Sequence, residues 1–356
     1  MNRPGAVLVT MTRHRLFWPV VLLIGLALSN LLFTPSFFSL QVKQGHLYGS
    51  IIDILRLVAP LVLVSLGMTV VIATRGIDLS VGSVVAISGA MACLRISHLS
   101  DQNAVTGVLA AMAVGLALAL AAGLWNGLLV AGLGIQPIIA TLILLVAGRG
   151  IAQLITDGQI ITIRSSPYAL VGAGYRAGLP FSILVAALVV VVCAAVIRWS
   201  ALGLMIEAIG GNAEASRLAG IRSRRIVWLV YAFCGLTAGI AGLMISSNVN
   251  SADGNNAGLW IELDAILAVV IGGTSLRGGR FYLGGTVVGA LLIQTLTTTL
   301  LTIGVRQEAT LLYKALVVTA VCLLQSPAFR ARVGLRRGRS AGSDDQVSAP
   351  REKVPA

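Results

Sequence analysis

The densest group of side chains able to make specific contacts lies in a polar stretch, residues 205–221, between two long apolar runs. Its alanine, glutamate and leucine content predicts a short helix, and the glycines at its ends are typical of turns. A short helix between membrane segments is suited to docking a soluble partner, and a plain loop is the alternative interpretation. The docking interpretation assigns contacts to Glu207, Gly210, Gly211, Asn212, Ala215, Ala219, Gly220 and Ile221.

Each residue type in this stretch has its own expected task. Glu207 or Glu214 would pair with basic groups on the partner. Gly211 would allow close approach of the two backbones because it has no side chain, and Ala215 and Ala219 would fill a shallow groove. A chain with such an element is expected to be one subunit of an assembly that is powered from outside itself.

A second group, residues 76–83, combines glycine, aspartate and serine just before a short apolar segment. Asp78 or Ser80 can cap the following helix by accepting its free N–H groups. Gly82, like Gly76 in the same motif, allows tight packing. Asp264 is expected to play the matching part in the second half of the chain. Direct contact of these residues with a substrate is the alternative.

Polar and aromatic side chains inside the apolar runs could face a pore, or could join neighbouring helices through hydrogen bonds. They are Trp125, Asn126, Gln136, Thr141, Gln153 and Gln294. Residues 246–256, which include Asn255 and Asn256, are dense in amide and hydroxyl groups and suit either a polar entrance or a solvated loop. Arg149 is a charge within or near an apolar run, which is costly in lipid and indicates a partner or a wet cavity.

No catalytic motif is present in the sequence. The chain has no G-x-x-x-x-G-K-[ST] phosphate loop, and its spans lack the converging histidines and carboxylates of a membrane enzyme. The four cysteines lie far apart within apolar runs, without metal-ligand spacing, and are expected to be packing residues. We therefore expect no cofactor and no metal, and any pumping must draw its energy from a partner or an ion gradient.

The composition is that of a multi-spanning membrane protein. Hydrophobic residues make up 57% of the chain and charged residues only 11%, and the mean hydropathy is +0.92. Apolar runs predict about ten membrane segments, of which two are short for a full crossing. The predicted segments are 16–33, 55–74, 81–94, 104–132, 135–155, 179–198, 226–246, 262–276, 281–303 and 309–325.

The basic residues predict the orientation. The chain has 26 Lys and Arg against 13 Asp and Glu, but they cluster in short segments between apolar runs, which is typical of topology signals rather than of nucleic-acid binding. Their distribution places both termini and the loop 199–225 in the cytoplasm. We expect a cytoplasmic segment 1–15, a permease domain 16–325 and a basic, disordered cytoplasmic tail 326–356. The first run is expected to be an uncleaved span, a cleaved signal peptide being the alternative.

The two halves of the chain resemble each other weakly. Residues 75–79 precede one short, small-residue segment and residues 261–265 precede the other. An odd number of predicted spans separates them, so the two repeats would run in opposite directions across the membrane. Inverted repeats with short broken helices near the bilayer midplane are typical of transporters.

Four motifs in order give this pattern a family. Together they resemble the ribose, xylose and galactofuranose branch of bacterial ABC sugar importer permeases, over roughly residues 16–325. Residues 121–127, 146–156 and 257–264 are most similar to a galactofuranose permease subunit. The four motifs are residues 76–83, 136–142, 207–212 with 219–221, and 263–276.

This resemblance implies an all-α integral membrane protein of the type II ABC importer kind, in a bacterial inner membrane. It implies two permease subunits around a central path, and in the galactofuranose system two different ones, hence a heterodimer. It also implies a cytoplasmic ATPase that fits the 205–221 helix, and a periplasmic sugar-binding protein that delivers the monosaccharide. The chain itself would be a transport subunit rather than an enzyme.

One residue departs from the family pattern, and two choices stay open. The family usually has glycine before Gly76, whereas this chain has Arg75; a bulky cation could disturb the turn there or simply add to the topology signal. The sugar could be galactofuranose, or ribose, xylose or another monosaccharide. A gradient-driven secondary transporter would share the inverted repeats but would need carboxylates within the membrane, and Asp53, Asp78 and Asp264 all lie at span edges.

Overall fold

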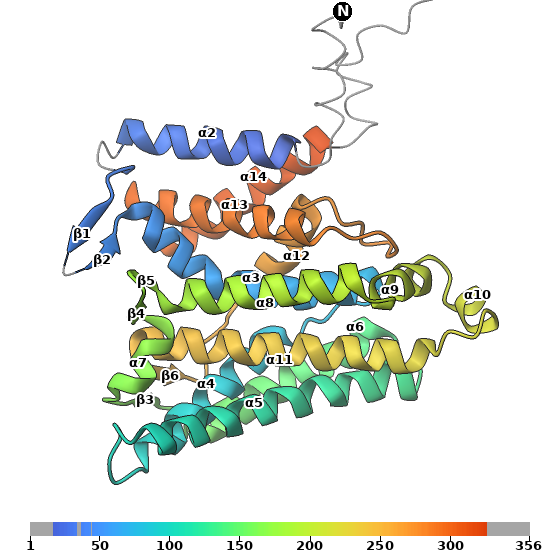
Figure 1. The fold of residues 1–356 in the computed structure, drawn as a ribbon, viewed down its shortest axis with the longest axis horizontal. Helices are drawn as coiled ribbons and strands as arrows, with labels where there is room; N and C mark the ends of the chain where they lie inside the picture. The colour runs from blue at the N-terminus through green and yellow to red at the C-terminus, as the bar shows by residue number, and fades with distance from the viewer. Residues whose placement is uncertain (1–16, 34–36, 44, 326–356) are drawn as a thin grey trace, which may run out of the picture.

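The computed structural model describes residues 17–33, 37–43 and 45–325, and most of its helices run side by side in one bundle (Figure 1). The predicted segment 1–15 and tail 326–356, and with them both termini, lie outside the described residues. Each predicted apolar segment contains a helix. These helices are α2 (Phe17–Phe33), α3 (Ser50–Ala73), α4 (Val81–Ser97), α5 (Val105–Gly127), α6 (Pro137–Ile155), α8 (Phe181–Trp199), α11 (Ser223–Val249), α12 (Ile261–Ile271), α13 (Leu283–Thr302) and α14 (Gln307–Gln325).

Length and composition identify the membrane-spanning helices. Within the described ranges six helices are long and apolar enough to cross a membrane: α3, α5 with its π-helical extension η1 (Leu128–Gly132), α6, α8, α11 and α13. The other four predicted crossings, α2, α4, α12 and α14, do not meet both criteria. The chain is thus a mostly helical, membrane-embedded protein, and six of the ten predicted crossings have the expected length.

Short strands depart from the all-α expectation. Within the described residues, β1 (Gln41–Lys43) pairs with β2 (His46–Tyr48), β3 (Ile160–Thr162) with β6 (Ser251–Asp253), and β4 (Tyr175–Arg176) with β5 (Leu179–Pro180), all antiparallel. These strands and α7 (Ser166–Gly172) gather at one end of the bundle, and α9 (Leu202–Gly211) and α10 (Ala213–Leu218) project from the other (Figure 1). The β3–β6 pair orders part of the 246–256 segment, where the sequence indicated only a loop.

Helix α11 forms the centre of the bundle and packs against α3, α4 and α5. Small residues make these contacts close: a Cβ added at Gly235 would lie 2.5 Å from the carbonyl oxygen of Ala119 in α5, and one at Gly67 in α3 would lie 2.8 Å from the Cα of Cys234. Glycine at such positions lets two helix backbones approach in a lipid environment, where apolar burial gives little drive for association. The central helices are therefore held together by close packing of their backbones at small residues more than by contacts between large side chains.

The short helices α4 and α12 begin beside each other. After α3 ends, residues 74–80 lead the chain into the buried core before α4 starts, and after α11, β6 and residues 254–260 lead it along the flank to the start of α12, where Trp260 is 48% exposed. The two starts meet, because a Cβ at Gly82 in α4 would lie 2.6 Å from the carbonyl oxygen of Gly258 and against the carboxylate of Glu262. The two helix N-termini thus lie together, that of α4 buried and that of α12 at the flank.

The elements around the two short helices run in opposite directions. Arg56 near the start of α3 bonds Asn248 near the end of α11, and Gly67 in the middle of α3 lies beside Cys234 in the middle of α11, so α3 and α11 are antiparallel.

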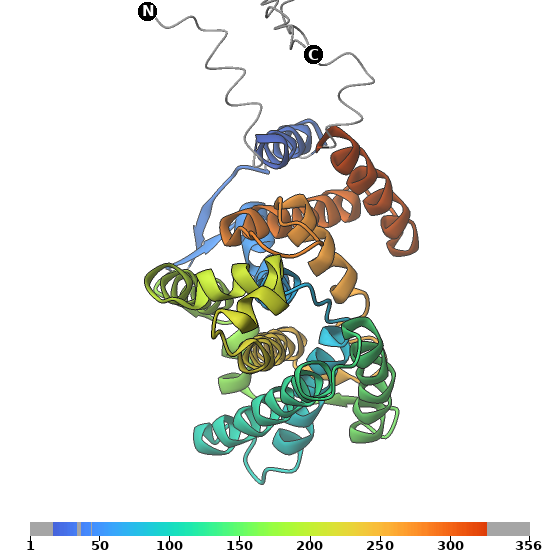
Figure 2. The same cartoon turned by 90° about the vertical axis from the view of Figure 1, so that its right-hand side faces the viewer.

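Figure 2, which looks along the bundle, shows α14, α12 and α6 along one flank. This flank carries the start of α12 and is described with the site below.

Candidate functional site

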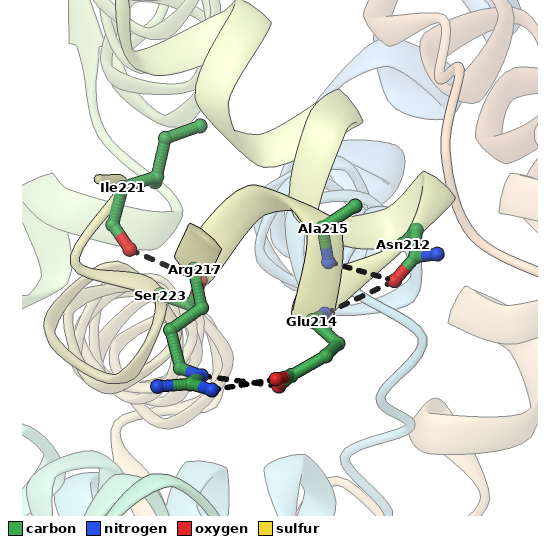
Figure 3. A network of polar contacts seen from close by, with 6 residues as sticks. All are labelled: Asn212, Glu214, Ala215, Arg217, Ile221 and Ser223. Atoms are coloured by element: carbon green, nitrogen blue, oxygen red, sulfur yellow. Dashed lines mark hydrogen bonds and ion pairs between the residues drawn. The ribbon is translucent and has the colours of Figure 1, made fainter. Parts of the chain in front are cut away.

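The predicted docking helix is two helices joined by a break at Asn212. Helix α9 ends at Gly211, and Asn212 takes an extended conformation (φ −156°, ψ 103°) before α10 begins. The Asn212 Oδ1 accepts hydrogen bonds from the backbone N–H groups of Glu214, at 3.1 Å, and Ala215, at 3.0 Å (Figure 3). Asn212 is therefore the N-cap of α10, a role that its amide side chain suits.

The two helices present a continuous exposed surface at their end of the bundle. Residues 211–215 and 217–220 are exposed, and Leu218 is 76% exposed at the tip. Gly220 turns the chain with φ 86°, a conformation that favours glycine. Of the residues assigned to docking, Gly211, Asn212, Ala215, Ala219 and Gly220 lie on this surface; Glu207 and Ile221 are half-buried and Gly210 is buried.

Glu214 is paired within its own helix. Arg217 donates to it twice, from Nε to Oε2 at 3.1 Å and from Nη2 to Oε1 at 2.6 Å (Figure 3). The hydrogen bond from Arg217, together with the attraction of its charge, lowers the pKa of the Glu214 carboxyl. Because both side chains are about two-thirds exposed, the pair contributes little to stability and either member can exchange its partner for a group on a docking protein.

Within the chain, the glycine of this pair that allows close backbone approach is Gly210. A Cβ at Gly210 would overlap the carbonyl oxygen of Ala73 and the backbone nitrogen of Gly279, whereas a Cβ at Gly211 meets nothing within 4 Å. The sequence shows two adjacent glycines and does not indicate which one faces inward. The close approach is therefore internal, and it binds the docking helices to the end of α3.

Asp78 organises the start of α4. Its Oδ1 accepts from the backbone N–H of Ser80 at 3.0 Å, from the Ser80 hydroxyl at 2.6 Å and from the Asn126 amide at 3.3 Å. The Asn126 amide also donates to the Ser80 hydroxyl at 2.8 Å. Asp78 thus orders the turn before α4 but does not cap the helix as predicted, and Ser80 stands at the N-cap position without capping through its own side chain.

Two of the predicted pathway residues join neighbouring segments through hydrogen bonds, which was the alternative to facing a pore. Asn126 is buried in the Asp78 network, and the buried Thr141 hydroxyl donates to the carbonyl oxygens of Pro137 and Ile77, at 2.9 and 3.2 Å. Both therefore hold α5 and α6 to the residues before α4. Neighbouring Gly76 is packed against the hydroxyl of Tyr231.

The remaining pathway candidates lie apart from one another. Trp125 and Gln136 are exposed near the end of α5 and the start of α6. Asn255 and Asn256 lie in the segment before α12, where Asn255 accepts from Gln153 and Asn256 donates to Asp253, both at 2.7 Å. The structure does not bring the predicted pathway residues together.

Charged residues from α6 and α14 flank the first turn of α12. Asp264 accepts a hydrogen bond from Lys314 of α14 at 2.8 Å, with side-chain exposures of 21% and 11%. Its predicted capping role is wrong, because Asp264 lies within the first turn of α12 and the N-cap is Trp260. The sequence signal for this pair was Lys314, a single charge in an apolar run.

Arg149 and Glu262 form the other side of this arrangement. The Arg149 Nη1 donates to the carbonyl oxygen of Ala257 at 2.7 Å, so the arginine has the partner that its cost in lipid requires. Glu262 is 6% exposed, lies within electrostatic range of Arg149, and has one carboxylate oxygen without a hydrogen-bond partner among the described residues. Sequence analysis gave Glu262 no role of its own.

A cavity of about 350 Å³ lies between α3, α11, α12 and α13, towards the end that carries the strands. Its walls combine apolar side chains with amide, carboxylate and guanidinium groups, a composition suited to a small polar molecule. The guanidinium and amide groups are already ordered, since Arg56 bonds Asn248 at 3.0 Å. The polar lining includes Arg56, Asn248, Asn256, Asp264 and Gln294.

Comparison with known proteins places these features in a family. Residues 50–324 match the family described as branched-chain amino acid transport system / permease component. The chain belongs to this family. It is therefore a transport subunit rather than an enzyme, as the sequence predicted.

Individual relatives match nearly the whole chain. The galactofuranose transporter permease protein YtfT of Escherichia coli (strain K12) is 47% identical over 90% of this chain and 94% of its own. The fructose import permease protein FruF of Bifidobacterium longum (strain NCC 2705) is 42% identical over 88% of both chains. The ribose import permease protein RbsC of Escherichia coli (strain K12) is 34% identical over 86% of this chain and 92% of its own. No solved structure matches the chain.

The two adjacent glycines of α9 should tolerate substitution very differently. Gly210→Ala should destabilise the permease by about 1–3 kcal/mol, because the added methyl group overpacks a backbone contact. Gly211→Ala is the matched control and should change stability by less than about 0.5 kcal/mol. Thermal midpoints of the two detergent-solubilised variants measure the difference, and equal midpoints would contradict the assigned contact.

The Asp264–Lys314 pair should show strong coupling. Asp264→Asn or Lys314→Met alone should lower stability by up to ~3 kcal/mol, because each leaves a poorly solvated charge without its partner. The double variant should lose less than the sum of the single losses. Unfolding of the four proteins in detergent completes the cycle, and additive losses would show that the two charges do not interact.

Proposed function

We propose that the chain is a permease subunit of an ATP-driven sugar importer and lines the path of a monosaccharide across the membrane. The observation that carries this proposal is the exposed α9–α10 surface, which is suited to docking a soluble partner, on a membrane-embedded chain that has no nucleotide-binding motif of its own. The proposal is further supported by relatives whose names are those of galactofuranose, fructose and ribose permeases.

Galactofuranose is the proposed sugar. This choice is supported by the 47% identity to the galactofuranose permease over 90% of the chain. The cavity near the strands has the volume and the mixture of amide, carboxylate and guanidinium groups that a monosaccharide needs. Ribose, xylose or another monosaccharide is the alternative, because a soluble binding protein ahead of the permease would make the first selection.

The two ends of the bundle would meet different partners. The α9–α10 end would face the cytoplasm and an ABC ATPase, which agrees with Arg222 just before α11 and with Arg224 and Arg225 in its first turn. The end that carries the strands would then face the periplasm and receive the sugar-binding protein. Both termini would be cytoplasmic, and the membrane would be the inner membrane of a bacterium. The ten helices would form two inverted repeats of type II importer architecture, with α4 and α12 as their broken helices.

A second permease subunit would cover the flank formed by α6, α12 and α14. Large apolar side chains on this flank are exposed, with Val146 at 73%, Leu154 at 78% and Leu312 at 71%. The charges at the start of α12 lie beside them, and lipid would be a costly neighbour for non-helical backbone and charged groups. A protein surface fits better, and the galactofuranose system favours a different chain, so we propose a heterodimer.

Uptake by the assembled transporter tests the energy source and the sugar. With the proposed ATPase and binding protein present, labelled galactofuranose should enter vesicles only with ATP, and inactivation of the ATPase alone should abolish uptake. Calorimetry of the binding protein with galactofuranose, ribose and xylose identifies the sugar. Uptake that survives loss of the ATPase but stops when the proton gradient is collapsed would contradict the proposal and identify a secondary transporter.

A tryptophan at Gly211 should separate docking from folding. Because Gly211 is exposed and a side chain there meets nothing within 4 Å, Gly211→Trp should insert and fold normally but obstruct the approach of the ATPase. Sugar-stimulated ATP hydrolysis should fall by at least roughly tenfold, the effect of a clash of 1.4 kcal/mol or more. Normal stimulated hydrolysis in this variant would remove Gly211 from the docking surface.

A further inference from the structure

We propose that Arg75 connects the docking helices, α9 and α10, to the two short helices α4 and α12 (the half-helices) and transmits movement between them. We call the Arg75 side chain the strut. The proposal rests on the function proposed above and adds to it a positioning residue. Three segments that are distant in the sequence meet at Arg75: the end of α3, the end of α9, and the loop between α12 and α13. Arg75 is the side chain that connects all three.

The backbone at Arg75 shows that a side chain is kept there at a cost. Arg75 has φ 66°, in the left-handed region, where a residue with a Cβ is strained and glycine is not. An arginine in this conformation is explained if its side chain returns a benefit that glycine cannot supply.

The Arg75 guanidinium supplies that benefit by bonding two backbone carbonyl groups. Its Nη2 donates to the carbonyl oxygen of Gly211 at 2.5 Å, and its Nε donates to that of Arg277 at 3.1 Å. Gly211 is the last residue of α9, so its carbonyl lies at the negative end of that helix, where a cation is favoured. The strut thus satisfies a carbonyl group that the helix leaves without an intrahelical partner.

The surrounding backbone makes the junction stiff. The N–H of Gly279 donates to the carbonyl oxygen of Ala73 at 2.9 Å. A Cβ at Gly278 would overlap the Cγ of Arg75, and the buried Gly210 packs on both Ala73 and Gly279. Little free space separates these groups, so displacement of α9 must move its neighbours rather than compress the junction.

Both half-helices are attached to this junction by short segments. Arg75 is three residues before Asp78, whose carboxylate fixes the start of α4. Arg277 is six residues after Ile271, the end of α12. A pull on α9 therefore reaches the starting end of one half-helix and the final end of the other at the same time, which links ATPase movement to the place where the two helices meet.

Variants at Arg75 in the assembled, reconstituted transporter test this proposal. Arg75→Gly relieves the backbone strain and removes the strut, so the protein should keep its thermal midpoint or gain stability. Sugar transported per ATP hydrolysed should fall roughly tenfold, as expected for loss of a hydrogen bond to a charged group. Arg75→Lys replaces the planar guanidinium by an ammonium group with a single point of contact. Its ratio of sugar transported to ATP hydrolysed should lie between the ratios of the wild type and of Arg75→Gly. Arg277→Ala is the matched control, because only the backbone of Arg277 accepts from the strut, and its transport ratio should not change.

Hydrogen exchange gives a second measurement that needs no sugar. In Arg75→Gly, amides of residues 208–212 and 275–279 should exchange faster than in the wild type, while those of α4 and α11 keep their rates. An unchanged transport ratio and unchanged exchange in Arg75→Gly would overturn the strut. A proportional loss of stability, hydrolysis and uptake would also overturn it, because that pattern belongs to a purely structural residue. If the wild type shows no ATP-dependent uptake, the proposed function fails first, and the strut fails with it.

Discussion

The architecture depends on two helix N-termini that meet within the membrane-embedded part of the chain. The first turn of a helix leaves backbone N–H groups without intrahelical acceptors, and in a lipid environment these groups must find partners within the protein. At the turn before α4, the Asp78 carboxylate accepts hydrogen bonds from the backbone N–H and the hydroxyl of Ser80 and from the Asn126 amide. At α12 the first turn carries Glu262 and Asp264, and acidic side chains are favoured there by the helix dipole. The positions of α5, α6 and α14 follow from this requirement, since each supplies a side chain to one of these two starts.

Charge placement around α12 follows the same logic. A carboxylate at a buried helix start is stabilised by the helix but still needs a counter-charge, and the flanking helices provide Arg149 on one side and Lys314 on the other. The Asp264–Lys314 pair contributes little net stability compared with apolar packing, but it strongly disfavours arrangements that separate its members. It therefore fixes where α12 begins relative to α14.

Periodicity and composition were sufficient to predict every long helix, because a run of apolar residues in a membrane protein has few alternatives to a helix. A structural role for Asp78 was also predictable, since an aspartate just before a helix readily accepts from nearby backbone N–H groups and orders the turn there. Hydrogen bonds between distant segments could not be predicted from the sequence. Asn126 and Thr141 are residue types that suit a pore as well as a structural role, and only the fold shows them bonded to the turn before α4. The same limit applies to Gly210 and Gly211, whose difference depends on which one faces Ala73. The paired strands were missed because two or three residues carry too little periodicity to detect.

The close backbone contacts at Gly210 and Gly279 determine how force can pass through this protein. A contact between long side chains can absorb a displacement by rotamer changes, but a contact between two backbones has no such freedom. We therefore expect movement of α9 to shift the packing around the starts of α4 and α12 between discrete arrangements rather than to bend the bundle gradually. The meeting of α4 and α12 is suited to such a switch, because Gly82 and Gly258 allow the backbones of the two helix starts to approach closely beside the Glu262 carboxylate. A small shift at the docking end can then separate or close the two starts, which changes access to the bundle interior.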